Sequence, residues 1–433
     1  MQRINKSRIA IKPIAFVILF FMVATVLFTF PLAFRINSYI SGFSSSDEPY
    51  AALSYMWWLR YAHLNHLSPA HITVTGAPFG QMFEPGYVYW NFVNRTLAIF
   101  TNIVFTYNLQ VLLSFLLTGI ATYMLANYIF RNRVVALFSA VLFTFCPYHA
   151  VRSWQHLGLA QIQWIPLYIW AFLLLHKTKR LGTILFLAIA FILVMSFDLY
   201  YAYFISILTV LLILFDFFYF RNAKETFRLM RALFLAGIFI LVFEIFDIYY
   251  IVKLVWNMHW SNMVHGVYGY IRPFEDLLSQ SARPLSYVLP AVAHPVFGRF
   301  TEQFIGSSFY GISLTEHTLY LGWIPLILAF VAIKVWKKRR KEIKYLGTVP
   351  FGDSPYCKEN FCIGFFIFLA IAAWFFSQPP WWKIGPIKIF MPSFFMYKIL
   401  PMFRAYCRFG IVVMLAVAVL AGFGLKFILE KFK

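Results

Sequence analysis

The sequence predicts an all-α membrane protein, a polytopic bundle of about ten transmembrane helices. Of its 433 residues, 61% are hydrophobic and only 12% are charged, whereas an average soluble domain has about 25% charged residues. The apolar residues also gather in uninterrupted runs, as at 14–33 and 411–425. A run near 20 residues is the length that crosses about 30 Å of hydrocarbon as a helix.

The apolar runs give the approximate bounds of each predicted span. The first run is about 20 residues long, longer than the core of a signal peptide, and no A-x-A cleavage pattern follows it, so we expect it to remain as a span. The ten spans lie at about 14–33, 108–130, 134–147, 159–175, 181–197, 203–220, 232–254, 318–336, 361–377 and 408–428.

The basic residues predict how the chain is oriented. The formal net charge is +21, and with the N-terminus inside, the short inner segments hold 24 Lys and Arg against 12 on the longer outer segments. Cytoplasmic loops of membrane proteins carry such an excess. We therefore expect a cell-membrane protein with both termini in the cytoplasm. Because topology accounts for the charge, nucleic acid is not expected as a partner.

The spans leave one integral membrane domain, 1–433, with three long outer loops at 34–107, 255–317 and 378–407. These loops are rich in Trp, Tyr, Phe and Pro. Aromatic side chains favour the interface between membrane and water. We expect the loops to lie on the bilayer as short interfacial helices.

The first outer loop contains an acidic pair, Asp47 and Glu48, directly before Pro49. A carboxylate just above the membrane could serve as general base on an acceptor hydroxyl. The same segment also fits a helix N-terminus, with Ser46 or Asp47 as the cap and Pro49 in the first turn. The two readings are compatible, because a cap also fixes the position of a side chain.

The second outer loop is short and holds His149, Arg152 and His156. Residues four apart lie on one face of a helix, so Arg152 and His156 are expected to point together, with His149 nearby. Arginine can grip a phosphate with two hydrogen bonds, which suits a lipid-linked phosphate. The alternative is contact with ordinary lipid headgroups.

Two arginines, Arg404 and Arg408, are again four apart, at the outer mouth of the last span. Positive charge on this side is not explained by topology. A phosphate would explain it, and snorkelling of long side chains to the interface is the alternative.

Three acidic residues lie at or near membrane depth: Asp198, Glu244 and Asp247; Glu316, at the end of the outer loop 255–317, is a further candidate. Ionisable groups inside a bilayer are costly and are functional candidates by default. Glu244 and Asp247 are three apart and would share a helix face inside the seventh span, where a structural ion pair is the other interpretation. No metal-binding motif is evident among the four cysteines.

The order of these motifs resembles that of the GT-C superfamily of polytopic membrane glycosyltransferases, especially its uncharacterised prokaryotic YfhO-like branch. The resemblance rests on the acidic element 46–50, on 78–80 in the first outer loop, on 147–157, and on 403–410 at the last span. Each motif is short, and the specificity comes from their order along most of the chain.

The resemblance implies a transferase that takes a sugar from a polyprenyl-phosphate donor on the extracytoplasmic face. It implies that Asp47 is the base, with Glu48 as its substitute, and that Arg152, Arg404 and Arg408 hold the lipid phosphate. The acceptor would be a glycan, a lipid or a protein. No cofactor is indicated with certainty, although the pattern leaves room for a divalent metal.

Two other function classes fit the sequence. A transporter or flippase of lipid-linked glycans would place charged residues within the spans, as Glu244 and Asp247 are placed. A non-catalytic assembly factor or lipid-binding scaffold would keep the fold and tolerate loss of Asp47.

Overall fold

The computed structural model describes residues 2–42, 48–69, 71–75, 78, 80–82, 88–260, 272–345 and 355–432. Helices dominate these ranges, as the sequence predicted, and the strands form two small hairpins. The first half of the chain forms the elements α1 Gln2–Phe28, η1 Leu32–Arg35, α2 Glu48–Leu64, β1 His71–Ile72, β2 Gln81–Met82, α3 Val88–Phe100, α4 Ile103–Phe130, α5 Arg133–Thr144, α6 Pro147–Gln155, α7 Leu157–Ala160, α8 Trp164–Thr178 and α9 Leu181–Phe197.

The second half begins with the long helices α10 and α11 and ends with α18. Its elements are α10 Leu199–Phe220, α11 Ala223–Phe243, α12 Ile245–Trp260, α13 Phe274–Ser279, η3 Pro284–Tyr287, α14 Gly298–Glu302, α15 Trp323–Tyr345, α16 Pro355–Ser377, β3 Trp381–Ile384, β4 Ile387–Phe390, α17 Pro392–Ile399, η4 Tyr406–Phe409 and α18 Gly410–Lys431.

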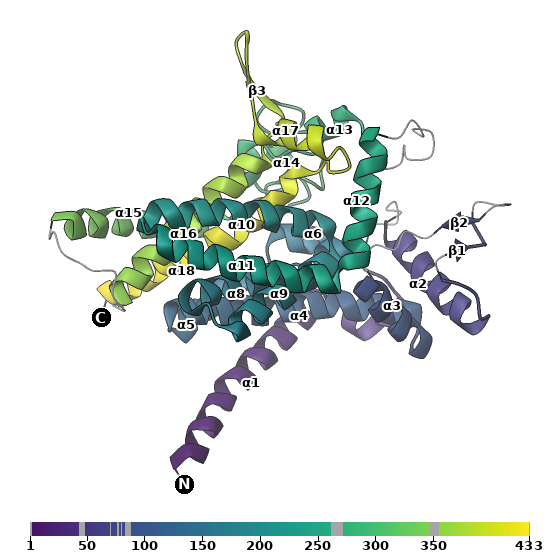
Figure 1. Cartoon of the computed structure of the whole chain (residues 1–433), viewed down its shortest axis with the longest axis horizontal. Helices are drawn as coiled ribbons and strands as arrows, with labels where there is room; N and C mark the ends of the chain where they lie inside the picture. Colours follow the sequence, from purple (N-terminus) through teal and green to yellow (C-terminus); the bar gives the residue numbers. More distant parts are fainter. Residues whose placement is uncertain are drawn as a thin grey trace. The chain divides into compact units, whose positions relative to one another are not determined.

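The contacts group the chain into two compact units. Unit 1 comprises 1–122, 149–201 and 235–251, and unit 2 comprises 123–148, 202–234 and 252–433. The sequence had predicted one membrane domain without internal boundaries. The elements of both units are labelled in Figure 1.

In unit 1, the first helix packs closely on α4. A Cβ on Gly119 would come within 2.2 Å of the Phe21 ring, so the absence of a side chain there lets the two helices approach. Phe28 and Phe115 continue this contact with ring centroids 5.4 Å apart. Elsewhere in the unit α8 packs on α9, α2 packs on α3, and α3 reaches α9.

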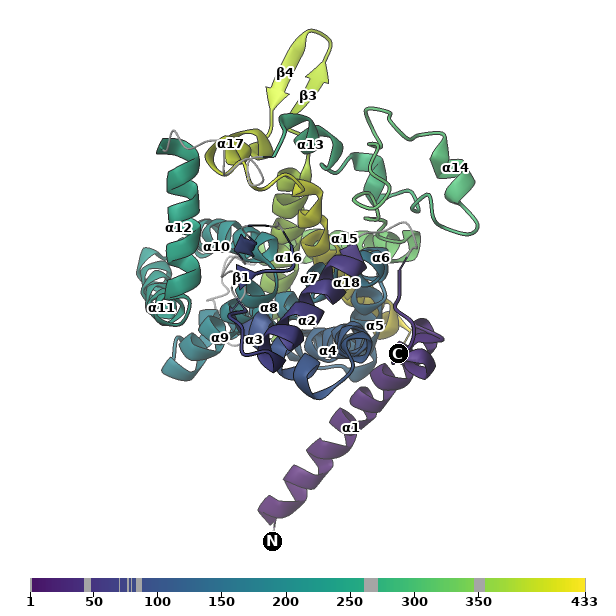
Figure 2. The ribbon, with the colours of Figure 1, turned by 90° about the vertical axis from the view of Figure 1, so that its right-hand side faces the viewer.

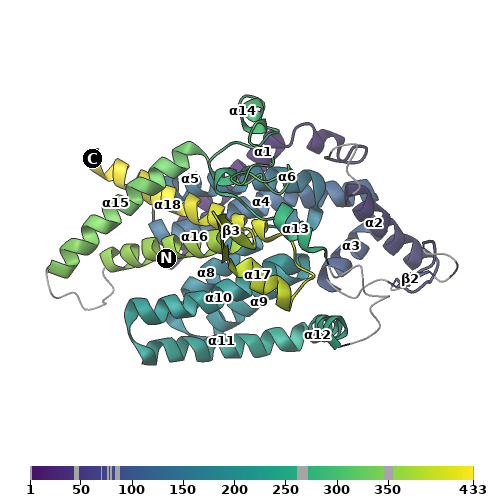
Figure 3. The same ribbon diagram turned by 90° about the horizontal axis from the view of Figure 1, so that it is seen from above.

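Unit 2 is built around α18, which packs against α5, α15 and α16. Figure 3 shows α18 between α15 and α5. Every residue of α18 from Gly410 to Gly424 is buried. Two glycines permit this close packing: a Cβ on Gly422 would lie 2.2 Å from the Ser139 hydroxyl, and one on Gly424 would lie 2.0 Å from the Leu328 carbonyl oxygen.

Five of the described helices are long and apolar enough to cross a membrane, or six if the bent pair α5–α6 counts as one span. They lie at Ile103–Phe130, Leu199–Phe220, Ala223–Phe243, Glu359–Ser377 and Tyr406–Lys431. Two shorter apolar helices, Ile14–Phe28 and Leu181–Phe197, match two other predicted spans. The count of ten spans and the cytoplasmic position of the termini remain predictions.

Two predicted spans lie next to breaks: 134–147 agrees with α5 within its approximate bounds, and 232–254 is wrong as a continuous helix. The run 134–147 ends as α5 at Thr144, and the chain bends by 44° into α6, which begins at Pro147. The run 232–254 is broken at Glu244, where α11 ends and α12 begins, and the chain turns sharply there (Figure 1). Hydropathy does not reveal the break at Glu244, because apolar residues continue on both sides, whereas Pro147 and the polar residues of α6 mark the first break.

The long predicted loops do contain short helices. The first holds α2 and α3, the second holds α13 and α14, and the last holds α17. The last loop also holds the antiparallel hairpin β3–β4, which the sequence did not predict. Figure 2 shows this hairpin extending beyond α17 and α13.

The packing of α18 predicts a contrast between two helical glycines. Gly424→Ala places a methyl group against the α15 backbone and should lower the stability of unit 2 by about 1–3 kcal/mol. Gly237→Ala, in α11, meets no atom within 4 Å, and should leave stability unchanged or raise it by up to about 1 kcal/mol through helix propensity. Thermal unfolding in detergent measures both variants. Equal melting temperatures for the two would contradict this account of the packing.

Candidate active site

A cavity of about 240 Å³ in unit 1 brings together candidate residues from three separate segments. Glu48 comes from the start of α2, His156 from the junction of α6 and α7, and Asp198 from the junction of α9 and α10. The other lining residues are Ala51, Ala52, Tyr55, Met56, Asn94, Leu157, Gly158 and Phe197. Most of the wall is therefore apolar, with five polar side chains converging on it, a pattern typical of small-ligand sites.

Glu48 lies in the first turn of α2, at the N-terminus that the acidic sequence predicted. A negative charge is favourable there because the helix dipole leaves the N-terminus positive. The carboxylate is 62% exposed and lies 3.8 Å from the Nε2 atom of His156. Asp47, the predicted base, lies outside the described residues.

His156 does not share a helix with Arg152, contrary to the prediction from their spacing. α6 ends at Gln155, and His156 has extended backbone as the N-cap of α7. Its Nδ1 atom accepts a hydrogen bond of 3.4 Å from the Leu159 amide. A ring nitrogen that accepts has no proton in the neutral ring, so Nε2 bears the proton and directs it towards Glu48.

Asp198 closes the cavity from a third direction. It ends α9, and its carboxylate accepts a 3.1 Å hydrogen bond from the Tyr201 amide, which caps the start of α10. The residue is only 4% exposed. The capping bond fixes the carboxylate at the cavity wall.

Sequence reasoning missed two polar residues of this cavity, Tyr55 and Asn94. Burial raises the pKa of Tyr55, so its hydroxyl stays protonated and can donate. Asn94 is buried, and its side-chain oxygen accepts a 2.9 Å hydrogen bond from Gln110. Asn94 could have been selected from the sequence as a polar residue within the apolar helix α3.

The other two candidate residues of the second outer loop, His149 and Arg152, face the interior of unit 1. His149 is fully buried, lies 3.1 Å from the Ser114 hydroxyl and stacks on Phe115. Arg152 is 3% exposed on the same helix. Neither belongs to the cavity lining, and their predicted role in phosphate binding stays a prediction.

Glu244 and Asp247 do not lie inside one continuous helix as predicted. Glu244 occupies the break after α11, and Asp247 lies in the first turn of α12. Both are buried, and Glu244 hydrogen-bonds with Asp247 and with Ser196 of α9. This contact ties the turn of the chain to α9 within unit 1.

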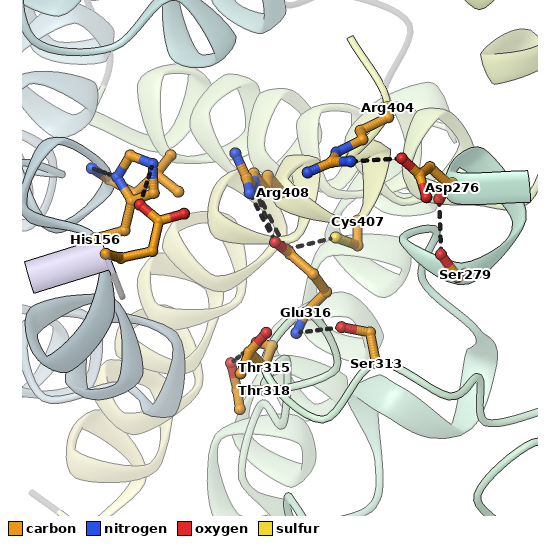
Figure 4. Close-up of polar contacts among 12 residues, drawn as sticks. His156, Asp276, Ser279, Ser313, Thr315, Glu316, Thr318, Arg404, Cys407 and Arg408 are labelled. Atoms are coloured by element: carbon orange, nitrogen blue, oxygen red, sulfur yellow. Dashed lines mark hydrogen bonds and ion pairs between the residues drawn. The ribbon is translucent and has the colours of Figure 1, made fainter. Parts of the chain in front are cut away.

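In unit 2, each of the two predicted phosphate-binding arginines meets a carboxylate (Figure 4). Arg408 forms an ion pair of 2.8 Å with Glu316, and Arg404 forms one of 2.5 Å with Asp276. The Cys407 thiol lies 2.9 Å from the second oxygen of Glu316. The sequence identified Glu316 as a candidate but gave no sign of Asp276.

The spacing of Arg404 and Arg408 had suggested that they share a helix face, and they do not. Arg408 lies in the 3-10 helix η4, and Arg404 precedes it. A 3-10 helix has three residues per turn, so a spacing of four no longer aligns side chains. Their role in holding a phosphate remains a prediction.

Across the described ranges, no three His, Cys, Asp or Glu side chains gather closely enough to hold a metal ion. Glu48, Asp198 and His156 line the cavity together, and the Nδ1 atom of His156 accepts the Leu159 amide hydrogen bond.

The fold is similar to that of the archaeal oligosaccharyltransferase AglB from Archaeoglobus fulgidus, solved in complex with an inhibitory peptide and a dolichol-phosphate. The likeness has a TM-score of 0.50 at 12% sequence identity and covers 96% of this chain and 50% of that one, so this chain spans about half the length of AglB. No family model and no curated protein matches the sequence. This likeness concerns the fold alone, and membership of the GT-C superfamily and of its YfhO-like branch stays a prediction.

Unit 2 also buries an uncharged histidine next to Glu316. His317 is fully buried, and its Nδ1 atom lies 3.0 Å from the Ser286 hydroxyl. Burial, aided by the nearby charge of Arg283, lowers the pKa of His317 to about 4, although Glu316 acts in the opposite direction.

This shift predicts that acid destabilises unit 2. An unfolded histidine binds a proton near pH 6.5, whereas His317 binds one only near pH 4. Stability should therefore fall as the pH drops from 6.5 to 4, by on the order of 3 kcal/mol from this residue. Thermal melts at stepped pH measure the slope. In His317→Asn the slope should be shallower, and an unchanged slope would contradict the assignment.

Proposed function

We propose that the chain is a membrane glycosyltransferase whose reaction takes place in the cavity of Glu48, His156 and Asp198. The observation that supports the proposal most directly is the convergence of two carboxylates and a histidine from three separate segments on one partly apolar cavity. The likeness of fold to an oligosaccharyltransferase agrees with it.

The proposed reaction transfers a sugar from a polyprenyl-phosphate donor to an acceptor hydroxyl. The hydroxyl oxygen attacks the anomeric carbon of the sugar, and the bond from that carbon to the phosphate oxygen breaks. The hydroxyl proton passes to a carboxylate, and polyprenyl phosphate leaves with the bonding electrons. A phosphate leaving group needs electrostatic stabilisation more than a proton.

Each residue of the cavity has a distinct proposed role. Glu48, or its neighbour Asp47, is the general base, since an acid on a helix N-terminus beside an open cavity is accessible to an acceptor. His156 directs its Nε2–H towards Glu48 and can stabilise the developing negative charge. Asp198, already held by its capping bond, can orient a sugar hydroxyl.

The cavity volume of about 240 Å³ lies slightly below the usual range of about 300–1,000 Å³ for ligand pockets. We infer that it accommodates one sugar ring and the reacting groups, with the polyprenyl chain in the membrane. The charge distribution of the loops supports placing it on the extracytoplasmic side. The acceptor is proposed to be a glycan, a lipid or a protein of the cell envelope.

Substitution of the acidic pair tests the proposal. The two variants are Glu48→Gln and Asp47→Asn. The one that removes the general base should lower the rate of sugar transfer by about 10²–10⁴-fold. The other of the two should have a smaller effect. The measurement is the release of labelled sugar from polyprenyl-phosphate hexose and pentose donors in membranes that contain the full-length chain.

A matched control is Glu302→Gln, which neutralises an exposed acid on α14 in unit 2. It should leave transfer unchanged. If both Glu48→Gln and Asp47→Asn keep the parental rate, the transferase proposal fails. The alternative function is a transporter of lipid-linked sugars. It would be favoured if Glu244→Gln abolished translocation of the lipid-linked sugar across the membrane and left the rate of sugar transfer unchanged.

A further inference from the structure

The hairpin β3–β4 in the last predicted outer loop has an exposed apolar surface. Its register pairs Trp382 with Ile389 and Lys383 with Lys388. Successive side chains of a strand point to opposite faces, so Trp382, Ile387 and Ile389 share one face. Ile387 is 63% exposed and Ile389 is 47% exposed. A two-stranded hairpin alone is marginally stable in water, which indicates that another surface covers this face.

Among the described residues, both faces of the hairpin contact unit 2 at its base, where Trp382 lies 6.4 Å from Phe309 between ring centroids. Trp381 stacks on Phe274 of α13, with ring centroids 5.4 Å apart, and lies against Phe394 of α17. Phe390 packs on Phe394 at 4.6 Å. These contacts fix the base of the hairpin, and its far half extends away from α17 (Figure 2).

Two lysines lie directly opposite each other in the far half of the hairpin. Lys383 and Lys388 are cross-strand partners, and both are exposed. Like charges at directly opposed positions destabilise a strand pair. The Lys388 ammonium also lies 4.8 Å from the centre of the Trp381 ring. An anion between the two lysines would turn this repulsion into attraction.

The hairpin runs crosswise to the long helices of its own unit. Figure 1 shows it rising at a steep angle from the end of α16, and in Figure 3 it is seen nearly end-on while α16 and α18 lie in the plane of the view. If α16 and α18 cross the bilayer, the hairpin extends along the membrane surface. Its two faces then match the two layers they would meet: the face of Ile387 and Ile389 meets the acyl chains, and the opposite face, with Lys383 and Lys388, meets the phosphates.

We propose that the hairpin 381–390 is a membrane-surface anchor that inserts Ile387 and Ile389 among lipid acyl chains and binds the phosphate of an anionic phospholipid between Lys383 and Lys388. The proposal is independent of the transferase activity. Its occupant is a bilayer lipid of the leaflet on the predicted outer side.

Photocross-linking tests the anchor. The full-length chain carries benzoylphenylalanine in place of Ile387 and is reconstituted into nanodiscs of equal parts phosphatidylcholine and phosphatidylglycerol. Mass spectrometry then identifies what the probe has captured. We expect lipid adducts, with phosphatidylglycerol enriched over phosphatidylcholine.

Lys383→Glu separates lipid binding from hairpin folding. This change places opposite charges across the strands, which should stabilise the hairpin, yet it removes one phosphate contact. The enrichment of phosphatidylglycerol should fall about fivefold. Lys398→Gln, an exposed lysine on the neighbouring helix α17, is the matched control and should leave the enrichment unchanged.

Three outcomes would overturn the proposal. Capture of a second protein chain would make the face a protein interface. Absence of adducts would mean that it faces solvent. Lipid adducts in the bulk ratio, unchanged by Lys383→Glu, would show that the lysines select no anion.

Discussion

The need to satisfy backbone hydrogen bonds away from water governs the structure of this chain. Helices meet that need internally, but every break in a helix leaves amide and carbonyl groups that require other partners. The candidate residues of unit 1 lie at such breaks. Glu48 opens α2, His156 caps α7, and Asp198 caps α10.

The same constraint explains why these groups are suited to chemistry. A side chain that caps a helix has one atom held by a backbone amide, as with Nδ1 of His156 and the carboxylate of Asp198. A side chain held in this way is oriented without the entropic cost of ordering a free side chain. In the cavity of unit 1, two of these fixed groups meet Glu48. Glu244, at a fourth break, instead hydrogen-bonds to Ser196 and Asp247 and stabilises the turn of the chain.

Composition and hydropathy were enough to predict the helical membrane fold, and chemical type was enough to select Glu48, His156 and Asp198. Spacing was less informative. It placed His156 on one helix with Arg152, but that helix ends at Gln155. It placed Arg404 on one helix face with Arg408, but Arg408 lies in a 3-10 helix that begins after Arg404. Local sequence cannot show contacts such as Arg404 with Asp276, which are 128 positions apart. The convergence of three loops, and the place of Asn94 among them, depends on tertiary packing.

The central claim is that Glu48 and Asp198 act in one site, and a double-mutant cycle on sugar transfer tests it most directly. Glu48→Gln, Asp198→Asn and the double variant are compared with the parent under the same donor and acceptor. Residues that act as a unit are strongly non-additive. The account predicts that the double variant loses no more activity than the more damaged single variant. Losses that multiply, or no loss in either single variant, would contradict it.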